Sequence, residues 1–198
     1  MQVLVLASGS QYRARLLGRL NLEFLSVSPD IDESPANGEK PDILACRLAH
    51  EKACASSVSA LASSLDHPAI IIASDQVAAV GDLTLGKPGN EANARQQLQA
   101  MSGKAVTFYT SLYMARFTTG QAFSWLDTTV ATLRVLSYDE IERYIAVDQP
   151  FDCAGSFKME TSGISLFERV STNDPTALIG LPMIAVCQGL RTLGVPVP

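Results

Sequence analysis

The stretch Ile70-Ile71-Ile72-Ala73-Ser74-Asp75-Gln76-Val77 is an apolar run that ends on a carboxylate and an amide. An uncharged, β-branched run of this length predicts a buried strand. Open α/β sheets bind their ligands just beyond the carboxyl ends of the strands, which is where this pattern puts Asp75. Asp75 is therefore the first candidate for a catalytic side chain, although a lone aspartate after a strand is more often a turn or helix cap.

Other charged residues also stand where elements are expected to begin or end. Lys87 lies between Gly86 and Pro88, Glu33 closes the run Asp30-Ile31-Asp32-Glu33, and Lys52 follows Glu51. Carboxylates and lysines placed in this way indicate one convergent site. For any single one of them, an ordinary solvated surface charge is the alternative.

Composition favours a globular protein with a sizeable core. Of the 198 residues, 47% are hydrophobic and 18% charged, which suits one domain over 1–198 or two closely fused lobes. The first residues lack a basic leader and nowhere do about 18 apolar residues run unbroken, so we expect a cytoplasmic protein without a membrane segment. A net charge of −5 without a basic cluster makes a nucleic-acid partner unexpected.

Cysteine and histidine are poorly placed for metal or nucleophilic chemistry. Cys46, Cys54, Cys153 and Cys187 show no C-x-x-C spacing, and we interpret them as small core residues. Only two histidines are present. Histidine-ligated metals and Ser-His-Asp hydrolysis are therefore not favoured.

The N-terminal region predicts a strand over 2–7, a small-residue turn and a helix. Ser10 can cap that helix, and the free N–H groups of its first turn, with Arg13 beside them, suit phosphate oxygens. No G-K-[ST] follows, so this is not a Walker loop. An ordinary capped turn without a ligand is the alternative.

Periodicity predicts the remaining elements. We expect Lys52 close to the buried stripe of a long helix, and Lys158 in a loop over 151–160 that can wrap a base or a phosphate. The predicted elements are helices over 41–64, 90–102, 137–147 and 183–193, and strands over 105–116, 122–135 and 164–170.

Several short motifs together resemble the Maf (septum-formation) family of nucleoside triphosphate pyrophosphatases, over 4–188. They are Leu6-Ala7-Ser8-Gly9-Ser10, Arg13, Asp32-Glu33, Ala49-His50-Glu51-Lys52-Ala53, Ala73-Ser74-Asp75-Gln76-Val77, Gly86-Lys87-Pro88, Ala154-Gly155-Ser156-Phe157 and Gly180-Leu181-Pro182. The resemblance implies an α/β fold related to inosine triphosphate pyrophosphatases, with a mixed, elongated sheet flanked by helices and two lobes around a cleft.

The resemblance also implies a reaction and the residues that perform it. The reaction is hydrolysis between the α and β phosphates with a divalent metal, usually Mg²⁺, with Mn²⁺ or Co²⁺ as alternatives. The family's general base falls on Asp75, and its other active-site positions fall on Ser8, Arg13, Glu33, Lys52 and Lys87. Ser10 and Lys158 are further candidates for binding the substrate, and Glu33 and Asp75 supply the oxygen ligands that Mg²⁺ prefers.

Within the family, the chain looks like the 7-methyl-GTP pyrophosphatase branch. The branch that prefers dTTP and UTP typically has Arg, Thr and Gln where this chain has Tyr12, Gln76 and Glu160. A 7-methylguanine ring is cationic and favours an aromatic face and a carboxylate. By residue type alone, Tyr12 is a packed helix aromatic and Glu160 a solvated loop carboxylate.

Two departures and two alternatives qualify this interpretation. The family's paired arginines appear here as Arg13-Ala14, so Arg15 is a candidate for the second cation, and the branch commonly has Trp at the position of Tyr12. The alternatives are the same chemistry on dTTP or UTP, and a nucleotide-binding regulator of cell division without turnover. The resemblance makes a homodimer plausible.

Overall fold

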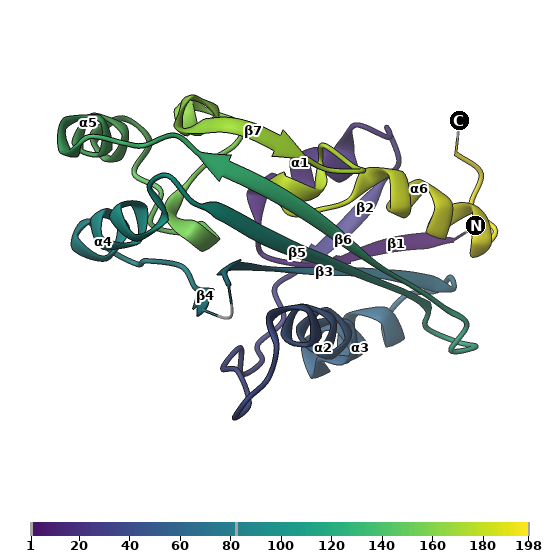
Figure 1. Cartoon of the computed structure of the whole chain (residues 1–198). Coiled ribbons are helices and arrows are strands. Elements are labelled where there is room, and N and C mark those ends of the chain that lie inside the picture. The colour runs from purple at the N-terminus through teal and green to yellow at the C-terminus, as the bar shows by residue number, and fades with distance from the viewer. Residues whose placement is uncertain (1, 82, 198) are drawn as a thin grey trace. The chain divides into compact units, whose positions relative to one another are not determined.

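Residues 2–81 and 83–197 are described by the computed structural model, which has an α/β fold (Figure 1). Residues 1, 82 and 198 of the predicted domain 1–198 lie outside that description. The strands are β1 (Val3–Ala7), β2 (Phe24–Val27), β3 (Ala69–Val80), β4 (Leu83–Leu85), β5 (Ala105–Arg116), β6 (Ala122–Leu133) and β7 (Phe167–Ser171). The α-helices are α1 (Gln11–Gly18), α2 (Pro41–Cys54), α3 (Ser56–Ser63), α4 (Glu91–Met101), α5 (Tyr138–Asp148) and α6 (Met183–Thr192). Between α5 and α6 lie three short 3₁₀ helices, η1 (Ala154–Ser156), η2 (Ser162–Leu166) and η3 (Ala177–Ile179).

The strands form one mixed sheet. In the described residues it has seven strands in the order β2-β1-β3-β5-β6-β7, with β4 paired to β3. β1 pairs in parallel with both β2 and β3, whereas β4 pairs antiparallel with β3 and β7 antiparallel with β6. The predicted mixed α/β sheet flanked by helices is therefore confirmed. The predicted cleft between two lobes stays a prediction.

The described chain divides into two compact units. The first unit comprises residues 2–75, 110–127 and 174–197, and the second comprises 76–109, without 82, and 128–173. None of the helices in 2–81 and 83–197 is long and apolar enough to cross a membrane.

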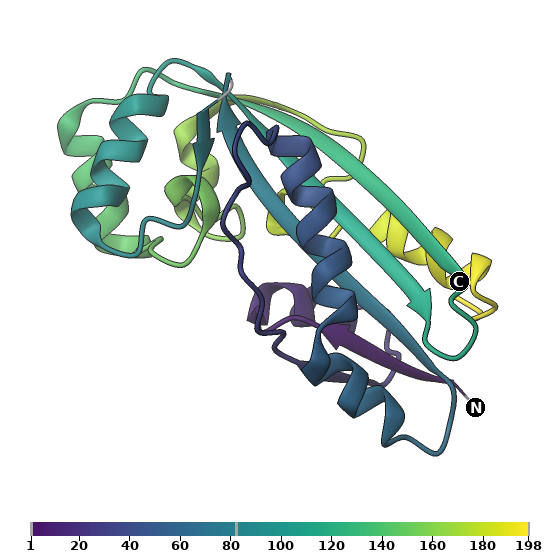
Figure 2. The ribbon, with the colours of Figure 1, turned by 90° about the horizontal axis from the view of Figure 1, so that it is seen from below.

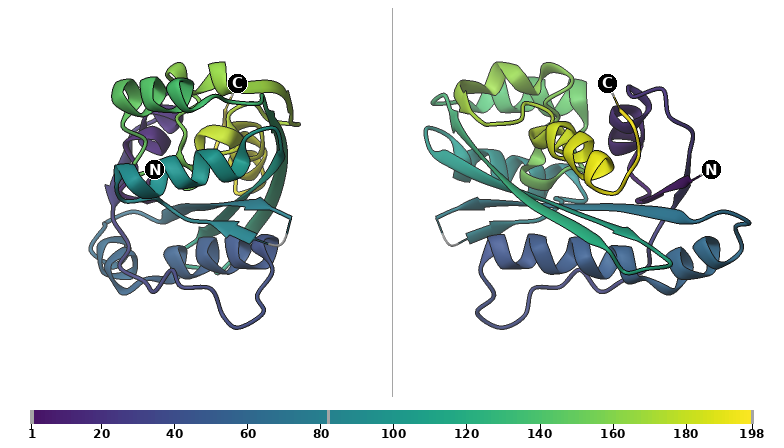
Figure 3. Two further views of the ribbon diagram at one scale, coloured as in Figure 1. Left: turned by 60° about the vertical axis from the view of Figure 1, so that its left-hand side comes forward. Right: turned by 90° about the vertical axis from the view of Figure 1, so that its right-hand side faces the viewer.

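In the first unit, helices cover both faces of β1 and β3. α1 and α6 lie on one side and α2 and α3 on the other (Figure 3, right). Successive residues of a strand point to opposite faces, so Ile70 and Ile72 join the cluster of α1 and α6, while Ile71 and Ala73 join that of α2 and α3. The unbroken apolar run of the sequence is thus explained by a strand that is buried on both faces.

In the second unit, α4 and α5 pack side by side (Figure 2). Three aromatic rings of this unit are in edge-to-face contact, with 5.0 Å between the centroids of Phe108 and Phe157 and of Phe157 and Phe167. Asn90 and Ser137 cap α4 and α5, and Ser137 forms a capping box with Glu140.

Three predictions about the elements are wrong. The strand that begins at Ala69 does not end before Asp75 but continues to Val80, because its second half is also apolar and pairs with β4. The helix predicted over 41–64 is two helices, broken at Ala55, whose ψ of 147° is extended. The first half of the strand predicted over 164–170 belongs to η2, and only β7 is extended.

The cysteines also differ from the prediction, since none of the four is buried. Cys46 and Cys54 are exposed, and Cys153 and Cys187 are partly exposed. Cys46 and Cys54 both belong to α2, whose buried residues are mostly alanines and leucines.

Candidate functional site

The turn from β1 to α1 brings together three of the predicted site residues, Ser8, Ser10 and Arg13. Ser10 caps α1, with its Oγ accepting from the Arg13 backbone N–H at 3.4 Å, as predicted. The Ser8 Oγ accepts from the Ser10 N–H at 3.2 Å and from Arg13 Nη1 at 3.4 Å. The short turn therefore places a guanidinium beside the N-terminus of a helix, a combination that suits an anion.

The alternation of β3 sends Ser74 and Asp75 to opposite faces of the sheet. Asp75 shares the α2 side with Ile71 and Ala73, and its Oδ1 accepts from Lys52 Nζ at 2.5 Å. Ser74 shares the other side with Ile70 and Ile72. The orientation of Asp75 is thus set by its position inside a continuous strand, which the sequence-based prediction of a strand end did not capture.

Lys52 joins two carboxylates from different parts of the chain. Its Nζ lies 2.5 Å from Asp75 Oδ1 and 2.6 Å from Glu33 Oε1. Lys52 and Asp75 are each only 6% exposed, whereas the Glu33 side chain is 46% exposed. Lys52, for which a solvated surface charge was the alternative, is instead buried between two of the predicted active-site carboxylates, because their charges offset its desolvation.

Arg13 belongs to the same electrostatic group. Burial lowers the pKa of the Arg13 guanidinium from its ordinary value, and the charges of Asp75 and Glu33 oppose that shift. Arginine stays protonated in proteins, so Arg13 remains a cation within reach of the charges of Asp75 and Glu33. The first unit holds two cations and two carboxylates close enough to act on one another.

The Gly180 carbonyl and the Ser74 hydroxyl, to which the sequence analysis gave no role, help to hold this arrangement. The Gly180 carbonyl oxygen accepts from Arg13 Nε at 2.8 Å and from Ser74 Oγ at 2.9 Å. Gly180 has a φ of +117°, and a Cβ there would lie 3.4 Å from Arg13 Nε. The sequence analysis identified the motif Gly180-Leu181-Pro182. Which donors a backbone carbonyl binds cannot be deduced from residue type, because every residue has a carbonyl.

The remaining predicted residues are mostly in the second unit. Lys87 is exposed between β4 and α4, Gln76 is half-buried on β3, and Glu160 is exposed in the loop after η1. Lys158 Nζ lies 3.4 Å from Asp152 Oδ1. Tyr12 is half-buried on α1 in the first unit. Joint action of these residues with Asp75, and of Tyr12 with Gln76 and Glu160, stays a prediction.

Comparison with known proteins gives the family. The model of the family described as "Maf-like protein" matches residues 3–193. The chain belongs to the Maf family. The resemblance found in the short motifs is thereby confirmed over nearly the whole length.

Curated relatives of this Maf-family chain carry a more specific name. Proteins named 7-methyl-GTP pyrophosphatase are 47% identical in Xanthomonas oryzae, over 100% of both chains, and 48% identical in Idiomarina loihiensis, over 97% of this chain and 95% of that one. Another so named, from Cupriavidus metallidurans, is 46% identical over 98% of this chain and 94% of that one. Among solved structures, the Staphylococcus aureus Ham1 protein aligns with a TM-score of 0.40 and 14% identity, covering 81% of this chain and 89% of that chain.

The donor set of the first unit is compatible with the divalent metal that the Maf resemblance implies. Glu33 and Asp75 each place an oxygen within hydrogen-bond distance of the same Lys52 nitrogen, so the two oxygens are close to one another. Within the described residues, no group of three or more His, Cys, Asp and Glu side chains is placed to hold a metal. Two carboxylates suit Mg²⁺, which usually takes one or two of them and completes its shell with water and substrate phosphates.

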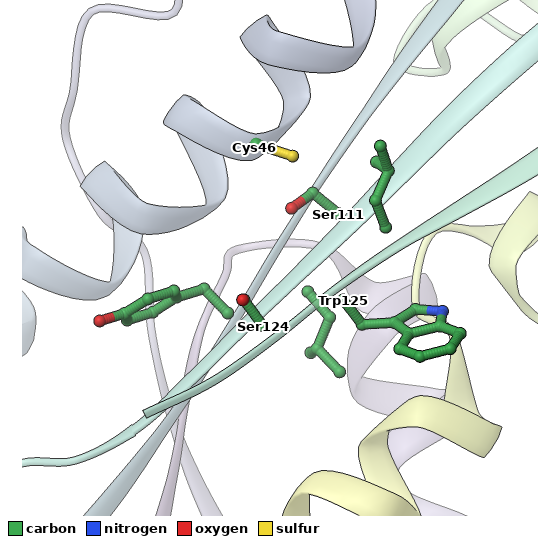
Figure 4. A pocket seen from close by; sticks show the side chains of 7 residues that line it. Cys46, Ser111, Ser124 and Trp125 are labelled. Carbon is green, nitrogen blue, oxygen red and sulfur yellow. The ribbon is translucent and has the colours of Figure 1, made fainter. Parts of the chain in front are cut away.

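A pocket elsewhere in the first unit does not involve these residues. It is lined by residues of the sheet and by Cys46 of α2, which points toward Ser111, and the ring of Trp125 points away from that helix (Figure 4). Its lining residues are Cys46, Ser111, Leu112, Tyr113, Ser124, Trp125 and Leu126. None of the predicted site residues is among them, so this pocket gives no argument about the reaction.

Proposed function

We propose that this Maf-family chain is a nucleoside triphosphate pyrophosphatase that hydrolyses 7-methyl-GTP to the nucleoside monophosphate and pyrophosphate. Support comes from relatives of that name, 46–48% identical over nearly the full length, and from the site itself. The observation that carries the proposal is the buried Lys52 ammonium shared by Asp75 and Glu33, close to Arg13. Burying a charged cluster of this kind costs free energy, and clusters of this kind occur preferentially at functional sites.

The cations account for binding of the triphosphate. Phosphoryl chemistry depends mainly on positioning and on neutralising negative charge, and no covalent intermediate is needed. Arg13, at the N-terminus of α1, and Lys52 hold phosphate oxygens in this proposal, and Lys87 is assigned the same role. Ser8, Ser10 and Lys158 are assigned further contacts to the substrate.

Asp75 is assigned the role of general base. Its Oδ1 is held by Lys52, so Oδ2 is the oxygen to which we assign the proton of the attacking water. The water oxygen forms a bond to the α-phosphorus, the bond from that phosphorus to the bridging oxygen breaks, and pyrophosphate leaves. A divalent cation held by Glu33 and Asp75 would supply charge neutralisation and a lower pKa for bound water.

Specificity for the methylated base is assigned to Tyr12, Gln76 and Glu160. The cationic 7-methylguanine ring gains from stacking on the aromatic face of Tyr12. The Glu160 carboxylate can accept hydrogen bonds from the N1–H and the exocyclic amine of the base. An uncharged pyrimidine gains much less from either residue.

The test is pyrophosphate release by the purified protein with Mg²⁺, compared across 7-methyl-GTP, GTP, UTP, dTTP, CTP and ITP. The control is Asp75→Asn, which keeps the size of the side chain and removes the base. We expect the fastest release from 7-methyl-GTP and its loss in the variant. Preference for UTP or dTTP would overturn the specificity assignment but not the mechanism. Nucleotide binding without turnover on any substrate would favour a regulator of cell division.

A further inference from the structure

Two amide side chains of α4 bind the backbone on both sides of Lys87. Asn93 Nδ2 donates to the Pro88 carbonyl oxygen at 2.9 Å, and Gln97 Nε2 donates to the Gly86 carbonyl oxygen at 3.1 Å. Residues four apart lie on one face of a helix, so both donors point the same way. The residue between the two bound carbonyls is Lys87, which the proposed function assigns to the phosphates.

Gln97 uses the other end of its amide to bind a second loop. Its Oε1 accepts from Ser156 Oγ at 2.5 Å. Ser156 is fully buried and has a φ of +58°, a left-handed conformation that costs free energy for a residue other than glycine. One amide group thus joins the Lys87 segment to the buried turn of η1.

The segment is also attached directly to the chain after α5. The Gly89 N–H donates to the Phe151 carbonyl oxygen at 3.0 Å, and Gly89 itself has a φ of +72°. Hydrogen bonds from α4 and to the chain after α5 therefore hold the backbone next to Lys87, although the lysine side chain is exposed.

The helix that carries the two amides is itself well anchored. Asn90 caps its N-terminus, and Ala94 and Leu98 are fully buried. Arg95 on the same helix binds both carboxylate oxygens of Glu142 on α5, at 2.5 and 2.9 Å. Functional groups held by supported side chains on a helix are more accurately placed than groups on a free loop.

We propose that Asn93 and Gln97 are positioning residues that hold the Lys87 segment for phosphate binding. The proposal rests on the role of Lys87 in the proposed function. A lysine side chain has many rotamers, and a fixed backbone limits the positions its ammonium reaches. Displacement of a substrate-positioning group by about 1 Å can lower a rate by as much as 10²-fold.

The test removes both donors with neutral replacements, in the double variant Asn93→Ala/Gln97→Met. Neutral residues avoid a new carboxylate next to Lys87. We expect kcat/KM for pyrophosphate release from 7-methyl-GTP to fall about tenfold. The matched control is Gln96→Met, the same change at an exposed position of the same helix, which should leave kcat/KM unchanged.

A double-mutant cycle separates positioning from a general loss of structure. In the Lys87→Ala background, Asn93→Ala/Gln97→Met should cause no further loss, because residues that act through one group are not additive. An equal loss in both backgrounds would overturn the proposal, as would an unchanged kcat/KM in the double variant. If the double variant does not fold, as judged by circular dichroism, Asn93→Ala and Gln97→Met are measured singly in the same cycle.

The same experiment distinguishes failure of this proposal from failure of the proposed function. Full activity of Lys87→Ala would remove Lys87 from the site and the positioning proposal with it. Loss of activity in Lys87→Ala, combined with an active Asn93→Ala/Gln97→Met variant, would overturn only the positioning role.

Discussion

Loss of Lys52 should destabilise the first unit, because its ammonium is buried between two carboxylates. Replacing it by methionine keeps most of the volume but leaves the buried Asp75 carboxylate without the ammonium that lies 2.5 Å away. Breaking a buried ion pair by removing one partner costs about 3–5 kcal/mol, and we expect Lys52→Met to lower the free energy of unfolding by about 3 kcal/mol. Denaturant unfolding measures this loss.

The cause of that loss can be separated from lost packing. Adding Asp75→Asn to Lys52→Met removes the unpaired charge, so the double variant should be more stable than Lys52→Met alone. The exposed Lys40 offers a control, since Lys40→Met should change stability by no more than about 0.5 kcal/mol. A double variant less stable than Lys52→Met would show that the charge of Asp75 is not the source of the cost.

At the scale of single residues, side chains with distinctive chemistry were predictable from the sequence, whereas the roles of backbone groups were not. Asp75, Glu33 and Lys52 were identified from the sequence, and the structure brings them together in the first unit. The Gly180 carbonyl, which binds both Arg13 and Ser74, could not be identified, because every residue has a carbonyl.

The break between α2 and α3 gives a test at the scale of elements. Ala55 has φ −57° and ψ 147°, the extended conformation that favours proline at the next position, and Ser56 is the first residue of α3. Ser56→Pro should therefore raise the free energy of unfolding by about 0.5 kcal/mol, by restricting the unfolded chain. In one continuous helix the same change would cost about 3 kcal/mol.

Ser59 is the matched control for that substitution. Its backbone N–H donates to the Ala55 carbonyl oxygen at 3.0 Å inside α3. Ser59→Pro removes this bond and should cost about 3 kcal/mol. Thermal unfolding measures the stability of both variants. Equal losses of stability at the two positions would contradict a break between α2 and α3.

No local signal in the sequence predicted this break. The segment Cys54-Ala55-Ser56-Ser57 contains neither proline nor glycine, and the N-cap Ala55 makes no side-chain cap. The residues around the break are packed against the sheet. The cluster that covers one face of β1 and β3 includes Ala53, Ala55 and Val58. Tertiary packing of this kind overrides helix propensity and is not visible in a window of sequence. The single helices α4 and α5, by contrast, begin and end close to the predicted residues.

The capping box of α5 predicts a pH dependence. Hydrogen bonds from the Ser137 N–H, and then from Arg134, lower the pKa of Glu140 to about 2. Because this value is below that of the unfolded chain, about 4.3, the unfolded state takes up the proton first as the pH falls. The stabilisation is therefore complete above about pH 5 and is lost as the pH falls towards 2.

Glu140→Gln tests this expectation. The variant should be less stable than the original chain at pH 7, and the difference should shrink as the pH falls from about 5 to about 2. Thermal unfolding at several pH values measures it. A difference that stays constant over this range would show that ionised Glu140 contributes nothing to the cap.

For the whole molecule, the sequence predicted the fold class but not every strand. The strand predicted over 2–7, the buried run around Ile70 and the segments predicted over 105–116 and 122–135 identified four strands of the sheet, β1, β3, β5 and β6. β2 and β4 were missed, because each is short, at four and three residues, and partly exposed. Short strands of this kind are specified by their partners in the sheet and carry little periodicity of their own.

Base preference is tested on the intact chain, because the three assigned residues are distributed over both units. Tyr12 lies on α1, Gln76 on β3 and Glu160 in the loop after η1. The variant Tyr12→Arg/Gln76→Thr/Glu160→Gln removes the aromatic face and the carboxylate that favour a cationic base. We expect kcat/KM for 7-methyl-GTP to fall at least tenfold relative to that for UTP and dTTP, since about 1.4 kcal/mol of lost discrimination suffices. Competition between the nucleotides in one reaction measures the ratio directly.

The surface change Gln99→Thr, on an exposed face of α4, should leave this ratio unaltered. An unchanged ratio in the triple variant, with pyrophosphate still released, would show that this chain selects its base through other residues.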